Sequence, residues 1–491
     1  LRSQVGGVNV VETQGNPYQL ELNYRGFTAS PLLGQPQGLS VFLDGVRVNE
    51  AFGDVVNWDL IPRGALAGMT LMPGSNPLFG LNTLGGALVL QTKSGDTDPG
   101  TELELGLGSH GRKDIELAHG MSLSDNTHLF VALSRFEQDG WRDFSPSEIT
   151  QVYAKLNGKQ GALDWRVAVN AADNSLIGNG LLPESMAEVR RSQVYTRPDR
   201  TDNRLGAFSV GLGWDLGNGQ RLQGHAYLRK LDVKTVNGDL NDAYDPPLVL
   251  ESGVENRTAG KQSSQGLALQ WSRSHAGNLT SLGVSVDSSK TDFSQTEAEG
   301  LLDDTRAVID LAPEELNAAI TGKSRTTSLW AEQIMQVTPD LTVSLSARHN
   351  RTKVTTVDTG RLQGLTTTLD ADDSYSKLNP VLGATFKLGG GTTAYASYSQ
   401  GNRAPSPIEL GCSDPANPCV LPNALQADPP LEQVVSRTLE AGLRGKLAGA
   451  GGDWRWNAGV FSTQNKDDIL FVSNSLAAGY FKNFGKTRRQ G

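Results

Sequence analysis

One stretch of the chain gathers basic and aromatic side chains that could bind an anion. The members of this cluster, which lie between residues 174 and 203, are Arg190, Arg191, Tyr195, Arg197 and Arg200. Guanidinium groups bind carboxylates and phosphates through paired hydrogen bonds, and a group of them attracts anions from a distance. The cluster therefore predicts charge steering of an anionic ligand, although binding to phosphates at a membrane surface or plain solvation would explain it as well.

The two cysteines, Cys412 and Cys419, form a second candidate pair. They enclose the turn-forming sequence Ser-Asp-Pro-Ala-Asn-Pro, which can bring their Cα atoms within disulfide reach. A metal site would need further ligands nearby, and the sequence offers none. We therefore expect a loop-closing disulfide, which favours an oxidising compartment.

No other set of residues predicts catalysis, a cofactor or a resident metal. The six histidines show neither helical i, i+4 spacing nor cysteine partners, and the sequence has no Gly-x-Ser-x-Gly nucleophile motif. The formal net charge of −9 lacks the basic surplus that nucleic-acid binding requires. We expect a protein that is not an enzyme and that binds no nucleic acid.

The elements that position these residues are strands. From about residue 101 onward, apolar and polar residues alternate, as in Phe208, Val210, Leu212 and Trp214 against their polar or glycine neighbours. This period of two predicts strands with one apolar face, and about 16 such segments of roughly 10 to 15 residues can be placed. The segment 312–320, with Pro313 near its start, instead suggests a short helix in a loop.

The links between these strands alternate between short and long. Short links fall at 123–127, 159–162, 216–219, 275–278, 338–340, 389–391 and 448–452. Between them lie longer segments, such as 174–203, 235–260 and 294–322. Tight turns at one rim and long loops at the other are typical of outer-membrane β-barrels, whose apolar face meets lipid and whose polar face meets a hydrated lumen. A soluble sandwich gives no reason for this alternation. No run of ~18 apolar residues predicts a membrane-spanning helix.

Residues 1–95 have a different pattern and predict a small α+β domain. Their apolar segments are short and separated by Gly and Pro, and a short helical turn is expected near Leu60–Met69. Asp44-Gly45 fits a two-residue hairpin turn, and Gly85-Gly86 would allow two backbones to approach closely. We place this domain at 1–95 and the barrel at 96–491.

Several motifs of residues 1–95 resemble the plug domain of TonB-dependent outer-membrane receptors. They are Tyr24-Arg25-Gly26-Phe27, Val41-Phe42-Leu43-Asp44-Gly45, Leu60-Ile61-Pro62, Pro73-Gly74-Ser75, Leu78-Phe79-Gly80 and Leu84-Gly85-Gly86. In the barrel, Tyr395–Pro405 looks like the family's strand that leads into an outer loop, which adds Arg403 to the ligand-steering candidates. The segment Tyr480–Thr487 looks like a late strand of the family.

The resemblance implies a 22-stranded outer-membrane barrel whose lumen holds the plug. It implies import of a scarce nutrient, most often an iron-siderophore or related metal chelate, driven by TonB with ExbB and ExbD. The same architecture could import cobalamin, a sugar or a peptide. Alternatives from other classes are a passive porin and a soluble β-sheet adhesin or enzyme. We expect a monomer that contacts outer-membrane lipids and lipopolysaccharide.

The resemblance also implies that the sequence is a fragment. The family's energy-coupling box before the plug and its terminal strand are missing, so about six strands are expected beyond Gly491. Within the plug, Arg25 is expected to form an ion pair, either inside the plug or to the barrel wall. Two interpretations of that pair remain open: one rearranges during transport, and the other is a static structural contact.

Overall fold

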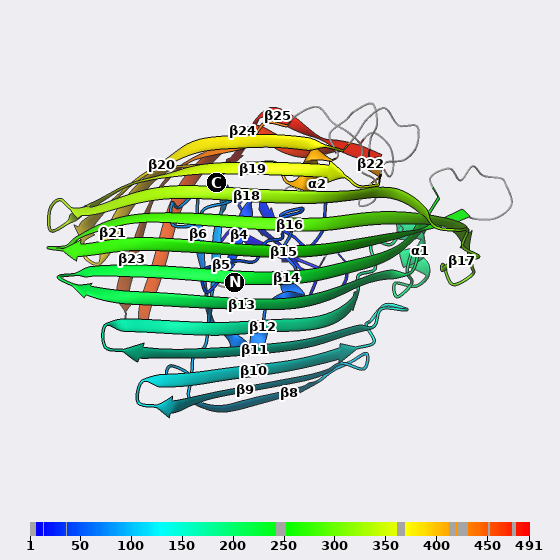
Figure 1. Ribbon diagram of the computed structural model, residues 1–491, viewed down its shortest axis with the longest axis horizontal. Helices are drawn as coiled ribbons and strands as arrows, with labels where there is room; N and C mark the ends of the chain where they lie inside the picture. The colour runs from blue at the N-terminus through cyan, green and yellow to red at the C-terminus, as the bar shows by residue number, and fades with distance from the viewer. Residues whose placement is uncertain are drawn as a thin grey trace.

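The computed structural model describes residues 6–12, 14–35, 37–241, 252–360, 369–411, 419–420, 431–449, 452–473 and 478–491. Within them the chain forms two parts, a small N-terminal plug and a large antiparallel sheet that curves around it (Figure 1). Among these described residues, no helix is long and apolar enough to span a bilayer.

The plug contains two small sheets. One has the order β1 (Val8–Val11), β2 (Glu21–Tyr24) and β3 (Phe27–Ala29). The other has the order β5 (Val46–Arg47), β4 (Leu39–Leu43), β7 (Gly86–Thr92) and β6 (Leu66–Pro73), with β4 parallel to β7. The helical turn expected near Leu60–Met69 is two 3₁₀ turns, η1 (Trp58–Leu60) and η2 (Arg63–Ala65), and β6 begins before that range ends.

The large sheet runs from β8 to β25. Its strands are β8 (Gly100–Leu107), β9 (Lys113–Ser124), β10 (Thr127–Gln138), β11 (Ser147–Gln160), β12 (Leu163–Ile177), β13 (Asp199–Gly217), β14 (Gln220–Leu240), β15 (Ser252–His275), β16 (Asn278–Leu302), β17 (Val308–Ile309), β18 (Glu315–Gln336), β19 (Leu341–Asp358), β20 (Ala371–Gly389), β21 (Thr392–Arg403), β22 (Cys419–Val420), β23 (Val434–Gly449), β24 (Gly452–Ser473) and β25 (Ala478–Gln490). Two short helices, α1 (Glu184–Val189) and α2 (Pro407–Leu410), decorate its loops.

The predicted mainly-β fold, with a plug inside a transmembrane-type antiparallel barrel, is confirmed. Leaving out the two-residue strands β17 and β22, the described part of the sheet has sixteen strands, as expected. Every predicted short link is a hairpin, and these hairpins gather at the left of Figure 1 while the longer connections gather at the right. We call the two rims the turn side and the loop side.

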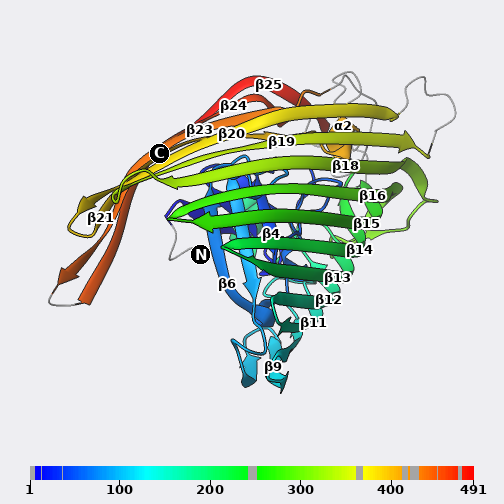
Figure 2. The ribbon, with the colours of Figure 1, turned by 60° about the vertical axis from the view of Figure 1, so that its left-hand side comes forward.

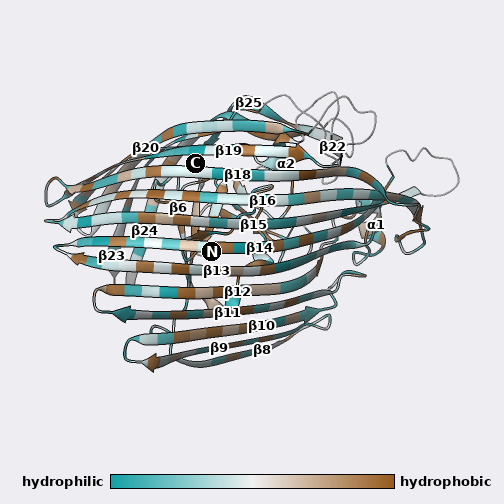
Figure 3. Ribbon diagram, viewed as in Figure 1, coloured by the Kyte–Doolittle hydropathy of each residue, from teal (hydrophilic) through white to brown (hydrophobic). Residues whose placement is uncertain are grey.

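The apolar face of the sheet points away from the plug. Leu212 and Trp214 on β13 are 50% and 53% exposed, whereas Asn203, on the opposite face of that strand, is 2% exposed. Figure 3 shows apolar and polar residues alternating along the strands. The apolar, exposed face of this sheet suits contact with lipid, and its polar, covered face suits a hydrated interior.

Two sequence predictions, one about strand length and one about a helix, were wrong in part of the sheet. Strands β9 to β12, β21 and β25 have 12 to 15 residues as expected, but β13 to β16, β18 to β20, β23 and β24 are longer, and β16 reaches 25, so much of the segments predicted as loops at 235–260 and 294–322 is strand. The helix expected at 312–320 is largely the start of β18, where Glu315 and Leu316 pair with Glu297 and Thr296 of β16. The hydrogen bonds of the ladder override local helix preference here.

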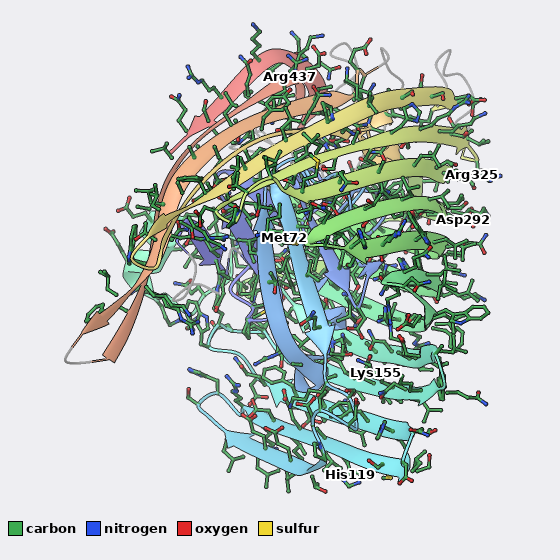
Figure 4. All side chains as sticks on the ribbon, turned by 90° about the vertical axis from the view of Figure 1, so that its left-hand side faces the viewer. Met72, His119, Lys155, Asp292, Arg325 and Arg437 are labelled. Carbon is green, nitrogen blue, oxygen red and sulfur yellow. The ribbon has the colours of Figure 1, made fainter. Side chains whose placement is uncertain are left out.

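The plug lies in the concavity of the sheet. Figure 2 shows β4 and β6 in the hollow of the curved wall, which covers them from above and from the right, and Figure 4, which looks nearly along the strands, shows side chains in the space between plug and wall. A hydrophobic core joins the parts, because Phe52 of the plug stacks on Phe293 of β16 at 4.7 Å between ring centroids.

Candidate functional site

Arg25 joins the plug to the wall. It occupies the turn between β2 and β3 at φ 52°, and Gly26 follows at φ 78°. Its guanidinium donates two hydrogen bonds to the carboxylate of Glu440 on β23, at 2.8 and 3.1 Å, and lies 4.1 Å from the ring centroid of Phe461. The expected ion pair is therefore present and runs to the wall.

The Asp44-Gly45 turn has the predicted geometry. Leu43 pairs with Val46, and Asp44 and Gly45 have φ angles of 47° and 89°. The Asp44 carboxylate accepts hydrogen bonds from Thr92 at 3.0 Å (backbone) and 2.5 Å (hydroxyl), and it lies 3.5 Å from Lys155 Nζ of β11. Lys155, labelled in Figure 4, reaches the plug from the wall.

The other predicted plug-motif residues lie where chain segments meet closely. A Cβ atom on Gly85 would overlap the Phe27 ring, one on Gly86 would overlap the carbonyl of Met72, and one on Gly80 would overlap Arg348 of β19. Gly74, at φ 69°, faces Ser399 of β21. Pro62 immediately precedes η2. At Gly85 and Gly86 a side chain is excluded for steric reasons, because the atoms it would meet belong to a buried ring and to the backbone.

A deeply buried ion pair between plug and wall is one that the sequence did not predict. Glu50 and Arg229 of β14 have side chains only 5% and 6% exposed and form two hydrogen bonds of 2.6 and 2.5 Å. Gln262 of β15 donates a further bond of 2.5 Å to Glu50. In this geometry each buried charge is compensated by the other, whereas either charge alone would be costly.

A second buried acid of the plug, Asp59 in η1, is held by amides. Asn174 of β12 and Asn203 of β13 donate hydrogen bonds to its Oδ2 at 2.8 and 2.9 Å. Burial raises the pKa of Asp59 above its usual range, although these hydrogen bonds oppose the shift. Gln151 of β11 adds bonds to the backbone carbonyls of Asp59 and Ile61.

Two of the cavities between plug and wall are large enough to hold a small molecule. The loop-side cavity, of about 390 Å³, is bounded by Leu32, Glu50 and Phe52 of the plug and by the loop-side halves of β13 to β16. The turn-side cavity, of about 620 Å³, is bounded by the Gly45 turn and by the turn-side halves of β11 to β16, together with Arg348 and Trp330. Glu50 lines the first cavity, and Arg47, which pairs with Asp54, lines the second.

Comparison with known proteins assigns this arrangement to a family. A model of the TonB-dependent receptor β-barrel matches residues 125–491, and a model of the TonB-dependent receptor plug domain matches residues 1–87. The chain belongs to the TonB-dependent receptor family. Such receptors are β-barrel proteins of the bacterial outer membrane and are not enzymes, as expected.

The relatives found share modest sequence identity with this receptor. The vitamin B12 transporter BtuB of Vibrio cholerae is 25% identical over 142 residues, which is 29% of this chain and 22% of that protein. Among solved structures, FpvA of Pseudomonas aeruginosa bound to a ferric pyoverdine has a TM-score of 0.74 at 16% identity, over 99% of this chain and 64% of that one. The ferric yersiniabactin uptake receptor FyuA of Yersinia pestis has a TM-score of 0.72 at 14% identity, over 99% and 71%.

These likenesses show the fold of the receptor. The chain spans about a fifth of the length of the curated relatives that it matches and about 64% of the FpvA chain. The ligands of those proteins do not identify the ligand of this chain.

The structure divides the predicted basic cluster. Arg200 and Tyr195 line the loop-side cavity, and Arg200 pairs with Asp202 at 3.2 Å. Arg190 pairs with Asp143 at 2.6 Å, and Arg197 packs over the Phe144 ring at 4.0 Å. These contacts balance part of the charge.

Two further candidates lie apart from the cavity, and one prediction falls partly outside the described residues. Arg191 is exposed and does not line the loop-side cavity. Arg403 is only 5% exposed and is paired with Glu409 of α2 at 2.6 Å, so it is buried away from solvent.

Cys412, and with it the predicted disulfide to Cys419, lies outside the described residues. Among the described residues, no group of three or more His, Cys, Asp or Glu side chains is placed to hold a metal ion.

Proposed function

We propose that the full-length receptor actively imports a scarce nutrient across the outer membrane. The observation that carries this proposal is the plug itself, which occupies the sheet's concavity and is tied to the wall by the buried Glu50–Arg229 pair. A passive pore needs a continuous aqueous path, whereas this arrangement places polar, hydrogen-bonded contacts between two cavities. Import therefore requires a plug that moves, and movement against such contacts requires an energy source.

The energy source we infer is TonB, acting with ExbB and ExbD from the inner membrane. Family membership supports this partner. A pull on the plug from the turn side would break plug–wall contacts one after another. Ligand binding at the loop side would favour the conformation of loops and plug from which that pull displaces the plug. Outer-membrane lipids would surround the apolar outer face, as its exposed leucines and tryptophans suggest. We expect the receptor to act as a monomer.

The nutrient we favour is an iron-siderophore or related metal chelate. Solved receptors for ferric pyoverdine and ferric yersiniabactin share the fold over nearly the whole chain, which supports the architecture required. The loop-side cavity offers both apolar side chains, such as Phe52 and Phe293, and amides and hydroxyls, such as Gln262 and Thr258. Such a mixed lining suits an amphipathic chelate that is held by a few hydrogen bonds.

Cobalamin is the second candidate, because the curated relative with 25% identity is a vitamin B12 transporter. Growth rescue with the full-length gene separates the two candidates. In a strain without its own receptors, the gene should restore growth when iron is supplied only as siderophore chelates. Restoration only when cobalamin is limiting would overturn the iron assignment and support the second candidate.

A further inference from the structure

The turn-side cavity contains a guanidinium with few protein partners. Arg166 of β12 faces the plug, and among the described residues its hydrogen bond runs from Nη2 to the backbone carbonyl of Asp44, at 2.9 Å. A guanidinium has five N–H donors arranged as a planar fork. Among the described residues no carboxylate lies within ion-pair distance of Arg166, and the side chain is exposed to the cavity.

A second guanidinium that lines this cavity has no acidic partner in contact within the described part of the chain. Arg348 is 5% exposed and donates to three neutral acceptors, the carbonyl of Pro77, the hydroxyl of Ser285 and the side-chain oxygen of Asn350. It lies 4.7 Å from the ring centroid of Trp330. Asp287, which lines the same cavity, compensates part of this positive charge from a distance and forms no ion pair with it.

The charge of the lining differs between the two cavities. Six cations line the turn-side cavity, Arg47, Lys155, Lys159, Arg166, Arg221 and Arg348, against three acids, Asp96, Asp164 and Asp287. Two of these cations have acidic partners outside the lining, since Lys155 pairs with Asp44 and Arg47 pairs with Asp54. With these two acids included, six cations face five acids, and the charge stays positive. The loop-side cavity has four lining acids, Glu50, Asp59, Asp199 and Asp239, and one cation, Arg200. An anion is therefore favoured on the turn side.

The surroundings of Arg166 leave room for a ligand. The absence of a side chain at Gly45 opens the space where Arg166 and His225 meet, because a Cβ at Gly45 would lie 3.9 Å from the His225 ring and 4.0 Å from Arg166 Nη2. The cavity volume of about 620 Å³ is sufficient for a group as large as a di- or tricarboxylate. Planar, paired donors suit carboxylates and phosphates.

We propose that the turn-side cavity is a second binding site, which takes an anionic group, a carboxylate or a phosphate, on Arg166. Lys159 and Arg348 contribute attraction without being required contacts. The role of the site as a stage on the import route rests on the proposed function; anion binding itself does not. A ligand that leaves the loop-side cavity would meet this site after the plug–wall contacts open.

Equilibrium binding of inorganic pyrophosphate to the purified chain in detergent, at low ionic strength, tests the proposal. Arg166→Gln should weaken association at least tenfold. The matched control is Arg204→Gln, which removes a guanidinium from the outer face, where Arg204 and Asp173 are 71% and 65% exposed. That control should change association less than twofold. Arg166→Lys, which keeps the charge but loses the planar pair of donors, should weaken association at least threefold and keeps the test valid if Arg166→Gln fails to fold.

Unchanged affinity in a folded Arg166→Gln protein would overturn the proposal, and so would equal losses in Arg166→Gln and Arg204→Gln, which would indicate a diffuse charge effect. Because binding is measured without import, these outcomes differ from a failure of the growth test. If the protein binds pyrophosphate through Arg166 but imports no iron, the proposed anion site stands and the proposed iron chelate is ruled out.

Discussion

The Glu50 carboxylate of the plug accepts two hydrogen bonds from the Arg229 guanidinium of β14, at 2.6 and 2.5 Å, and both side chains are almost fully buried. The pair lies between a cavity that faces the loops and one that faces the turns. Its partners are 179 positions apart in the sequence, so only the folded chain brings them together.

Removing one charge from this pair should loosen the plug. Glu50→Gln leaves Arg229 buried without a counterion, which typically costs about 3 to 5 kcal/mol. Urea-dependent exposure of the plug to protease should therefore shift to lower urea. The matched control is Asp173→Asn, which breaks the exposed pair with Arg204 and should cost less than about 1 kcal/mol. Equal shifts in both variants would contradict the importance of the buried pair.

Asp59 should make plug stability depend on pH. Its pKa is raised in the folded protein, mainly by burial, so the folded state binds more protons than the unfolded state above the usual carboxyl pKa of about 4. Stability should then be highest below that value and should fall as pH rises toward the raised pKa. Asp59→Asn should flatten this dependence in urea titrations at several pH values. A slope that persists in the variant would assign it to another group.

Gly85 should tolerate no side chain. Gly85→Ala places a methyl group into the Phe27 ring, and overpacking of this kind typically costs about 1 to 3 kcal/mol. Gly68→Ala is the control, since a Cβ there meets no atom within 4 Å. Urea unfolding of the two variants should differ by that amount. Similar midpoints would mean that the plug relaxes around Phe27.

The Arg25–Glu440 pair allows the two interpretations of its role to be separated. Arg25→Gln, Glu440→Gln and the double variant form a cycle, for which contacting charged pairs give coupling energies of about 0.5 to 3 kcal/mol. A pair that rearranges during transport should also alter the import rate in each single variant. A static pair should alter urea stability alone, with import unchanged in the variants that still fold.

Local sequence chemistry predicted those parts of the fold that depend on neighbouring residues. Asp44-Gly45 has the turn geometry that its residue types favour, and the tight turns fall at Gly217-Asn218-Gly219 and at the other short links. The period of two located the strands, because the two faces of the sheet have different surroundings. Strand length could not be predicted in this way, since pairing with a long neighbour extends a strand beyond its own pattern.

Contacts between distant segments were beyond local reasoning. Arg403 is a basic residue next to an expected outer loop, which predicts that it faces a ligand. The fold instead buries it against Glu409. Asp59 and Glu50 gave no signal, because the partners of their carboxylates belong to strands that lie more than a hundred positions away. The spacing of charges along the chain does not indicate which of them meet inside a barrel.

The most direct test of the account is a tether between plug and wall. A Cβ atom at Gly74 of the plug would lie 4.0 Å from the Cβ atom of Ser399 on β21, which is the separation of a disulfide, so a Gly74→Cys, Ser399→Cys pair can tether plug to wall in the full-length receptor. The control pair Asn23→Cys, Thr28→Cys links two paired plug strands to each other. Uptake of a radiolabelled ferric siderophore should stop in the oxidised tether, return after reduction and continue in the control. Undiminished uptake with the plug–wall disulfide fully formed would contradict import through a moving plug.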